Sequence, residues 1–330
     1  MLYNLISKTY RSMVYTRADD TGAVFYFTAK DFPGLHTEPV TVRSSCGHDL
    51  LGAFYWYDDP IPGRVVLFEH GMGSGHTGYM KEIELLCRHG FRVFAYDHTG
   101  CMSSGGETTG GFAQSLCDCN DVLNALAKEE GCAGCTFSVI GHSWGGLSTL
   151  NIAAFHPEVT HIVSLAAPIS VSALICGMFS GILAKTGKRL AAEETAQNPV
   201  FGVCDARTSL PMTEAHILVL HSSDDPTVSC AAHFDVLKSA LGGKDNIRFV
   251  KVEGKAHNPN YTADAVKYKD AFFAEYKKAL KKKQLVTDEQ KNAFRAGYDW
   301  NRMTEQDASV WDMIFETLDK PAPGECSHAH

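Results

Sequence analysis

The sequence has little that would place the chain in a membrane or on nucleic acid. No segment reaches about 18 consecutive apolar residues, which a membrane-spanning helix needs, so we expect no membrane span. Lys8 and Arg11 interrupt the first 14 residues, where a secretory signal would need an apolar core. The 30 Lys and Arg are outnumbered by 38 Asp and Glu, and the formal charge of −8 argues against nucleic acid as a partner.

The sequence also lacks a compact cysteine framework. Its 11 cysteines are an odd number and are spread over the whole chain, which is not typical of a disulfide-stabilised secreted domain. Cys117, Cys119, Cys132 and Cys135 lie near one another, but Cys117 and Cys119 fall on one expected helix and face different directions. We therefore expect a cytoplasmic protein without a metal or other cofactor.

Strand and helix patterns alternate from Val65 onward, after an antiparallel lead-in expected at 23–28, 40–43 and 50–57. This alternation predicts the α/β class, with a doubly wound, mostly parallel sheet. A chain of 330 residues with 45% hydrophobic and 21% charged residues can bury one large core. We predict a single domain over residues 1–330, and the sequence does not indicate an oligomeric state.

Two segments extend beyond the regular alternation. The connection at about 169–213 is longer than compact α/β domains need, and its apolar helical patterns predict a cap or lid, with a peripheral helical hairpin as the alternative. A helical extension is predicted at about 284–320, and its last helix, near 305–318, should pack on the body of the domain.

The pentapeptide Gly141-His142-Ser143-Trp144-Gly145 lies between an expected strand and an expected helix. In that setting Ser143 stands on a tight turn with its hydroxyl exposed. The helix N-terminus beside it has unpaired N–H groups, which suit a developing oxyanion. Ser143 is therefore the candidate nucleophile.

A serine nucleophile needs a base and an acid that orients the base, in the chain order acid then histidine on this kind of scaffold. Asp224 and Asp225 follow an apolar strand at 216–220, and His257 follows an alternating strand at 247–252. Each candidate thus lies in a loop directly after a strand, where the carboxyl ends of parallel strands meet.

With these motifs the chain resembles an α/β-hydrolase of the monoglyceride-lipase and serine-aminopeptidase-like branch. In that family the acid lies in a His-Gly-x-x-Asp-x-x-Val stretch, which implies Asp225, although Ser222 replaces the glycine and leaves Asp224 as the alternative. The family's Gly-x-x-His pattern matches at Gly254 and implies His257 as the base.

The resemblance also implies an oxyanion hole. The family's His-Gly-x-Gly turn matches at His70, so that the backbone N–H of Met72 would bind the oxyanion together with the N–H of Trp144. A dinucleotide loop at Gly71–Gly75 is the alternative, but no acidic residue ends a second strand in the required relation.

The resemblance implies that the cap covers Ser143 and forms an acyl pocket, for which Met178 and Phe179 are the candidate lining residues. We expect a serine hydrolase of small-molecule carboxylic esters with short-to-medium acyl groups, similar to carboxylesterases and lipases. Two alternatives stay open: an aminopeptidase or amidase, whose substrate amine could bind Glu193 and Glu194, and a binding protein without catalysis. Otherwise these glutamates should face solvent.

Overall fold

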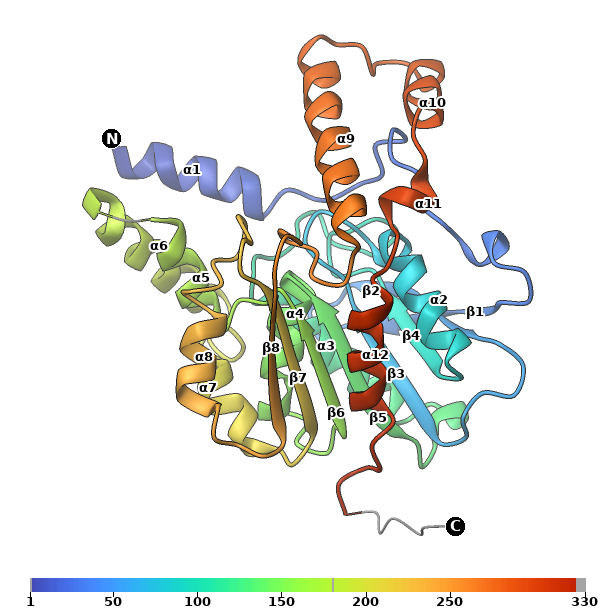
Figure 1. Cartoon of the computed structure of the whole chain (residues 1–330). Coiled ribbons are helices and arrows are strands. Elements are labelled where there is room, and N and C mark those ends of the chain that lie inside the picture. The colour runs from blue at the N-terminus through green and yellow to red at the C-terminus, as the bar shows by residue number, and fades with distance from the viewer. Residues whose placement is uncertain (1, 180, 325–330) are drawn as a thin grey trace.

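A computed structural model of the chain describes residues 2–179 and 181–324. Its centre is an eight-stranded sheet in the order β1-β2-β4-β3-β5-β6-β7-β8 (Figure 1). The strands, in chain order, are β1 (His36–Arg43), β2 (Asp49–Trp56), β3 (Arg64–Glu69), β4 (Arg92–Tyr96), β5 (Thr136–His142), β6 (His161–Leu165), β7 (His216–Ser222) and β8 (Ile247–Val252).

The sheet is antiparallel at one edge and parallel elsewhere. β1 pairs with β2 and β2 with β4 in the antiparallel sense, whereas all pairs from β4 to β8 are parallel. The carboxyl ends of β3, β5, β7 and β8 therefore lie along one edge of the sheet. This confirms the predicted α/β class with its doubly wound, mostly parallel sheet.

Alternate side chains of the strands face two separate cores. Val65 and Leu67 pack with α3 (Gln114–Leu126) and α8 (Phe234–Leu241) on one face. Val66 and Phe68 pack with α2 (Met80–Arg88) and α12 (Ala308–Leu318) on the other. This period of two is expected for strands that are buried on both faces.

The last helix, α12, packs on the body of the domain, as its apolar stripe predicted. Val310, Trp311, Ile314 and Leu318 are all buried against the sheet. The chain reaches α12 only after α9 (Ala263–Lys281), α10 (Asp288–Ala296) and α11 (Trp300–Met303) have risen above the carboxyl edge of the sheet (Figure 1). We call residues 263–303 the α9–α11 arch.

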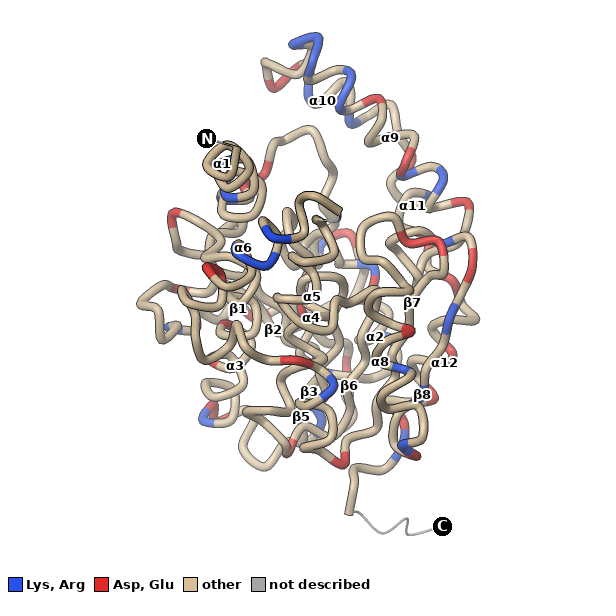
Figure 2. Tube along the Cα trace, turned by 90° about the vertical axis from the view of Figure 1, so that its left-hand side faces the viewer, with Lys and Arg blue, Asp and Glu red and all other residues tan. Residues whose placement is uncertain are grey.

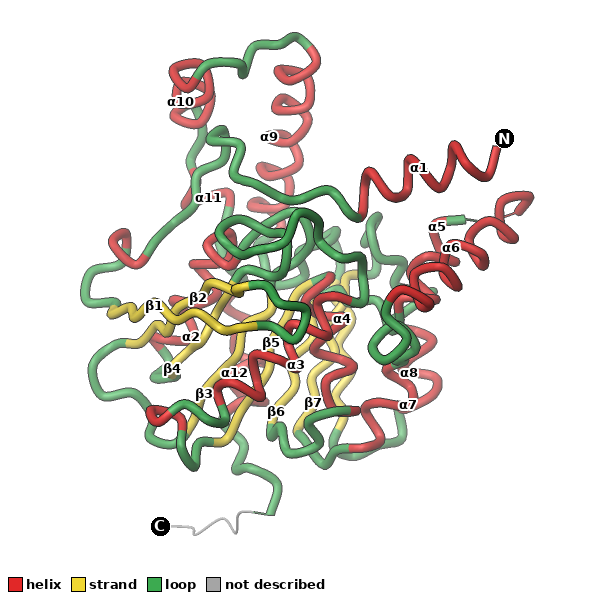
Figure 3. Tube along the Cα trace, turned by 180° about the vertical axis from the view of Figure 1, so that it is seen from behind, coloured by secondary structure: helices red, strands yellow, loops and turns green. Residues whose placement is uncertain are grey.

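A second group of helices lies beside the arch at the same edge of the sheet. It contains α5 (Val171–Met178) and α6 (Ala184–Gln197) from the segment predicted as a cap, together with α1 (Leu2–Val14) (Figure 3). The remaining helices are α4 (Trp144–Asn151), which follows β5, and α7 (Ala206–Ser209). Within residues 2–179 and 181–324 no helix combines the length and apolar character that crossing a bilayer would require.

One expected strand is absent: residues 23–28 form no strand. Their aromatic side chains pack on the arch instead, because the Phe25 ring lies 6.1 Å from that of Trp300 and Ala23 is buried near Ala279. The antiparallel lead-in strand predicted at 23–28 was therefore wrong, because the hydrophobic surface that these residues cover belongs to helices distant in the chain.

Candidate active site

Ser143 occupies the sharp turn between the end of β5 and the start of α4. Its backbone has φ of 56°, a left-handed conformation that a serine rarely adopts and that costs conformational energy. The turn requires glycines on both sides, because a Cβ at Gly141 would lie 2.5 Å from the Gly145 carbonyl oxygen. A Cβ at Gly145 would lie 2.2 Å from the carbonyl oxygen of Glu69.

The structure brings the predicted nucleophile, base and acid together. The His257 Nε2 atom lies 2.8 Å from Ser143 Oγ, and His257 Nδ1 lies 2.7 Å from Asp225 Oδ2. The three residues follow β5, β8 and β7, so that neighbouring strand ends position them. This hydrogen-bonded arrangement can move a proton from the serine hydroxyl to the imidazole.

The Asp225 carboxylate is held in its ionised form. Burial alone would raise its pKa, but hydrogen bonds from His221 and His257 outweigh burial and hold the pKa well below its ordinary value. The second oxygen, Oδ1, accepts the backbone N–H groups of Thr227 at 2.8 Å and Val228 at 3.0 Å. The carboxylate is thereby fixed in both charge and orientation.

The neighbouring Asp224 has different partners. Its Oδ1 accepts the N–H of Gly254 at 3.1 Å and the Ser222 hydroxyl, and its Oδ2 accepts the N–H of Ala256 at 3.4 Å. Asp224 therefore binds the backbone of the loop that carries His257, whereas Asp225 contacts the imidazole. The serine that replaces the family's glycine completes this loop contact.

The two predicted oxyanion donors lie close to Ser143: Trp144 follows it in the chain, and Met72 comes from the glycine turn after β3. Met72 lines the pocket that contains Ser143, and Trp144 is the first residue of α4. Within the described part of the chain, neither backbone N–H has a hydrogen-bond acceptor. Both amides are thus available to a ligand oxygen.

A bridge through His142 connects the parts of this site. The Tyr79 hydroxyl accepts the Gly71 N–H at 3.1 Å and lies 2.9 Å from His142 Nδ1, while His142 Nε2 lies 2.6 Å from the carbonyl oxygen of His257. Burial, reinforced by the nearby His257, lowers the pKa of His142 to about 3, so its ring is neutral at pH 7. Nε2 then donates to the carbonyl and Nδ1 accepts from Tyr79.

The sequence alone did not predict this bridge. The contacts join three segments that are far apart in the chain, and no local pattern at His142 indicates them.

The pocket at Ser143 has a volume of about 500 Å³. Its walls come from the glycine turn after β3, residues 19–26, the loop after β8 and the α9–α11 arch. Aromatic side chains dominate this lining: Phe25, Tyr26, Tyr79, Tyr261, Phe272, Phe273, Tyr276 and Trp300. The pocket can therefore enclose an apolar group next to the nucleophile.

Met178 and Phe179, predicted to line an acyl pocket, do not line this one. The Met178 side chain is 49% exposed, and Phe179 packs beside Gly187 of α6. They lie elsewhere because α5 and α6 share their apolar surface with α1, where Tyr10 and Val14 are buried. The structure thus does not support their assignment as acyl-binding residues.

The expectation that Glu193 and Glu194 face solvent was wrong for Glu194, which is 3% exposed. Its carboxylate accepts the hydroxyls of Tyr10 at 2.8 Å and Tyr15 at 2.7 Å, as well as the N–H of Phe112. Glu193 accepts the Tyr3 hydroxyl at 2.6 Å. Both glutamates thus hold the N-terminal segment against α6, and neither lines the pocket at Ser143.

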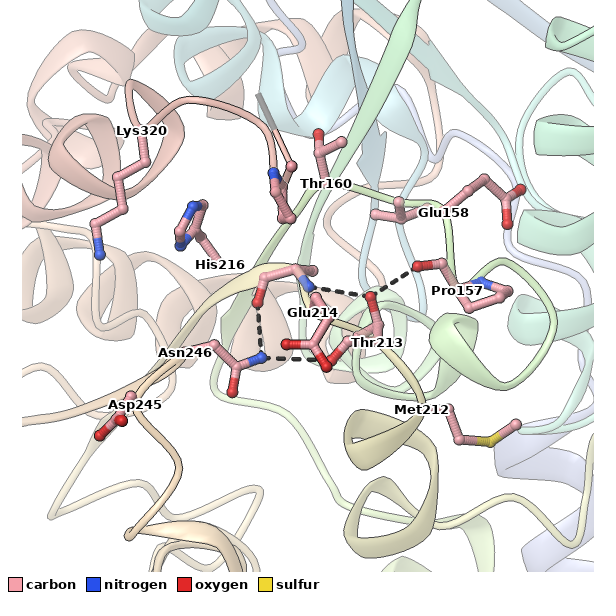
Figure 4. A pocket seen from close by; sticks show the side chains of 14 residues that line it. Pro157, Glu158, Thr160, Met212, Thr213, Glu214, His216, Asp245, Asn246 and Lys320 are labelled. Carbon is pink, nitrogen blue, oxygen red and sulfur yellow. Dashed lines mark hydrogen bonds between the residues drawn. The ribbon is translucent and has the colours of Figure 1, made fainter. Parts of the chain in front are cut away.

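A larger hollow of about 790 Å³ lies at the opposite edge of the sheet, where β6 and β7 begin (Figure 4). Thr213 and Asn246 are engaged by the surrounding loops, for example through the Thr213 hydroxyl, which donates to Pro157 at 2.8 Å. None of the residues that we predicted as catalytic lines it. Among the described residues no group of three His, Cys, Asp or Glu side chains could hold a metal ion.

Comparison with known families agrees with this geometry. Residues 60–201, which include the glycine turn and the serine turn, match the family model described as serine aminopeptidase, S33. Two relatives carry the name carbamate hydrolase RutD: that of Agrobacterium fabrum (strain C58) is 34% identical over 97 residues, and that of Rhizobium rhizogenes (strain K84) is 30% identical over 98. Each match covers 29% of this chain and only about a third of the relative, namely 34% and 35%.

Solved structures share the fold at low sequence identity. The esterase Pf2001 of Pyrococcus furiosus superimposes with a TM-score of 0.57 at 18% identity, over 81% of this chain and 95% of the esterase. A puromycin hydrolase matches with a TM-score of 0.52 at 16% identity, over 68% of this chain and 36% of that protein. These similarities show that the chain shares its fold with these two hydrolases.

Proposed function

We propose that this chain, which has the α/β-hydrolase fold and matches the serine aminopeptidase family model over residues 60–201, is a serine hydrolase that cleaves carboxylic esters through an acyl-enzyme. The observation that carries this proposal is the unbroken hydrogen-bond path from Ser143 Oγ through His257 to Asp225. A serine hydroxyl becomes a competent nucleophile when such a base is in reach and an acid orients it.

In the first half of the reaction, Ser143 Oγ attacks the ester carbonyl carbon while His257 Nε2 takes the hydroxyl proton. Asp225 stabilises the imidazolium that forms and keeps its ring in the required orientation. The negative charge that develops on the carbonyl oxygen is bound by the backbone N–H groups of Met72 and Trp144. His257 then protonates the leaving alcohol, and the acyl group remains on Ser143.

In the second half, His257 removes a proton from a water molecule that attacks the acyl carbonyl. The same two N–H groups bind the second oxyanion. Collapse of this intermediate breaks the bond to Ser143 Oγ, which recovers its proton from His257 and releases the carboxylic acid. The reaction needs no group beyond the residues named here and water.

The lining of the pocket favours esters over the substrates of an aminopeptidase. Aromatic walls suit an apolar acyl or alcohol group of short-to-medium length within about 500 Å³. The alternative required Glu193 and Glu194 to receive a substrate amine, but their carboxylates bind tyrosine hydroxyls away from this pocket.

Turnover of a substrate panel tests this function. The panel contains p-nitrophenyl esters of increasing acyl length, p-nitrophenyl carbamates and aminoacyl p-nitroanilides, each assayed with the parent enzyme and with Ser143→Ala. We expect the esters to be cleaved best and Ser143→Ala to lose several orders of magnitude in kcat. Preferred cleavage of the anilides would favour the aminopeptidase, and absence of all turnover would favour a binding protein.

A further inference from the structure

One basic side chain in the wall of the pocket at Ser143 makes no ion pair with a described carboxylate at contact distance. Lys269 is half-buried on α9 and is the only Lys or Arg among the described residues that line the pocket. Its ammonium donates a hydrogen bond to Asn258 Oδ1 at 3.2 Å and lies 4.8 Å from the centre of the Tyr261 ring. No carboxylate of the described residues lies within 4.0 Å of it.

The charges of Glu82 and Asp270 favour the ammonium form and so oppose the lowering of the Lys269 pKa by burial, but neither carboxylate forms an ion pair with Lys269. Asp270 is exposed at the pocket wall and Asp19 pairs with Arg17 at 2.6 Å. Glu82 lies buried beneath this wall, where its Oε1 accepts from Asn260 at 3.2 Å, and burial raises its pKa. Figure 2 shows acidic and basic residues interspersed along α9 and α10.

The position of Lys269 on α9 directs it toward the ligand space. Lys269, Phe273 and Tyr276 recur at intervals of four and three residues, so they share one face of the helix, and all three line the pocket. Asn258, which accepts the bond from Lys269, follows His257 directly in the chain. The ammonium thus stands at the boundary between the reacting groups and the aromatic wall.

A partly desolvated ammonium without a carboxylate is unfavourable in the free protein, because burial removes water that stabilises its charge. Accordingly, burial lowers the pKa of Lys269. An anionic group on a bound ligand would supply the missing partner, and charge-assisted hydrogen bonds in such surroundings are stronger than neutral ones.

From this arrangement we propose that Lys269 binds a carboxylate on the substrate, so that preferred substrates are esters that combine an apolar body with a negatively charged group. This proposal rests on the proposed ester hydrolase function and specifies its substrate class. Lys269 would act as a specificity residue that touches the substrate away from the scissile bond.

Matched ester pairs test this directly. The charged members are the mono-p-nitrophenyl esters of adipic, suberic and sebacic acid, and the neutral members are the p-nitrophenyl esters of hexanoic, octanoic and decanoic acid. The readout is the ratio of kcat/KM for the charged ester to kcat/KM for its neutral partner, in the parent enzyme and in Lys269→Met. Spontaneous hydrolysis is subtracted for each ester.

We expect the parent enzyme to prefer at least one charged ester by roughly 10- to 100-fold, chiefly through KM, and Lys269→Met to abolish that preference. Lys269→Arg keeps the charge and should keep part of the preference. Lys267→Met, an exposed lysine of the same helix outside the pocket, should leave the ratio unchanged. The preference should weaken as salt is raised from 0.05 to 0.5 M.

Two results would overturn the proposal. One is a charged-to-neutral ratio of kcat/KM near one in the parent enzyme. The other is an equal loss of kcat/KM for both esters in Lys269→Met, which would mean that Lys269 only positions the loop after His257. Thermal unfolding of each variant shows whether it is folded. Labelling of Ser143 by a fluorophosphonate separates this failure from failure of the hydrolase assignment, because an ester hydrolase without charge selectivity would still be labelled.

Discussion

Two groups of helices cover the carboxyl edge of the sheet, and they differ in what they do with their apolar surfaces. The cap helices α5 and α6 turn theirs toward α1 and α4, forming a closed cluster with Tyr10, Leu147 and Leu190. The α9–α11 arch turns aromatic side chains toward Ser143 and lines the pocket. A long apolar insertion therefore need not be the element that binds substrate.

The difference follows from what each group has beside it. The cap has α1, whose tyrosines bind Glu193 and Glu194 and whose apolar residues complete a core. The arch faces the open ends of the strands, where the catalytic loops leave a space that its aromatic rings only partly fill. Neither group supplies the proposed nucleophile, base or acid, all of which follow strands.

The largest loss of activity is expected from a substitution in the loops that follow the strands, not from one in either group of helices. Asp225→Asn should lower kcat by about 10³- to 10⁴-fold, because the imidazolium loses its counter-charge and the ring its orientation. Asp224→Asn, which alters only backbone contacts of the loop after β8, should cost about 10-fold or less. Steady-state kinetics on one ester checks this ranking, and the reverse order would assign the catalytic acid to Asp224.

The next effect tests the attachment of α1 to the cap. Glu194→Gln should lower the free energy of unfolding by about 1–3 kcal/mol, because an amide cannot accept from two hydroxyls and the Phe112 N–H as a carboxylate does. Glu193→Gln, at a partly exposed site, should cost less than about 1 kcal/mol.

Urea unfolding of both variants measures this difference, and ester turnover of the folded variants should change little. A shift in acyl preference in Glu194→Gln, without any change in stability, would mean that the cap contributes to the pocket after all.

A smaller effect is expected on acyl-chain preference, and it should differ between one phenylalanine from each group of helices. Phe273→Ala enlarges the pocket and should change the ratio of kcat/KM for long and short acyl esters by roughly 4- to 15-fold, which corresponds to burial of one to two methylene groups. Phe179→Ala should leave that ratio unchanged, since its ring packs on α6. The opposite result would restore the cap as the acyl-binding element.

The last effect, which grows as the pH falls, concerns the His142 bridge. The pKa of His142 is lowered to about 3 in the folded protein, against about 6.5 when unfolded, so below pH 6.5 the unfolded chain binds a proton that the folded one does not. Stability is therefore complete above pH 6.5 and falls toward pH 3, by up to about 1.4 kcal/mol per pH unit for this group.

His142→Gln, which retains a donor and an acceptor, should unfold with a shallower dependence on pH between 6 and 4. Burial also lowers the pKa of His161 and of His233, both to about 4, but these two histidines contribute equally to parent and variant. Identical pH slopes would mean that the imidazole is charged in the folded protein.

Local patterns were sufficient to predict the strands of the sheet, the turn at Ser143 and the position of His257 after β8, because each depends on a few adjacent residues, but they wrongly predicted a strand at 23–28. The choice between Asp224 and Asp225 needed the resemblance, since both acids lie in the same loop. The lining of the pocket could not be predicted, because it depends on packing between residues 19–26 and the arch, more than 200 positions away. For the same reason the burial of Glu194 by α1 could not be predicted from the sequence.

The most direct test of the account is where a fluorophosphonate probe reacts. Peptide mass spectrometry of the labelled parent protein should find the adduct on Ser143, and labelling should be lost in Ser143→Ala and in His257→Ala while thermal unfolding shows that both variants are folded. Prior incubation with a cleaved ester should slow the labelling. An adduct on another residue, or no adduct on folded parent protein, would contradict the assignment of Ser143 and His257 as nucleophile and base.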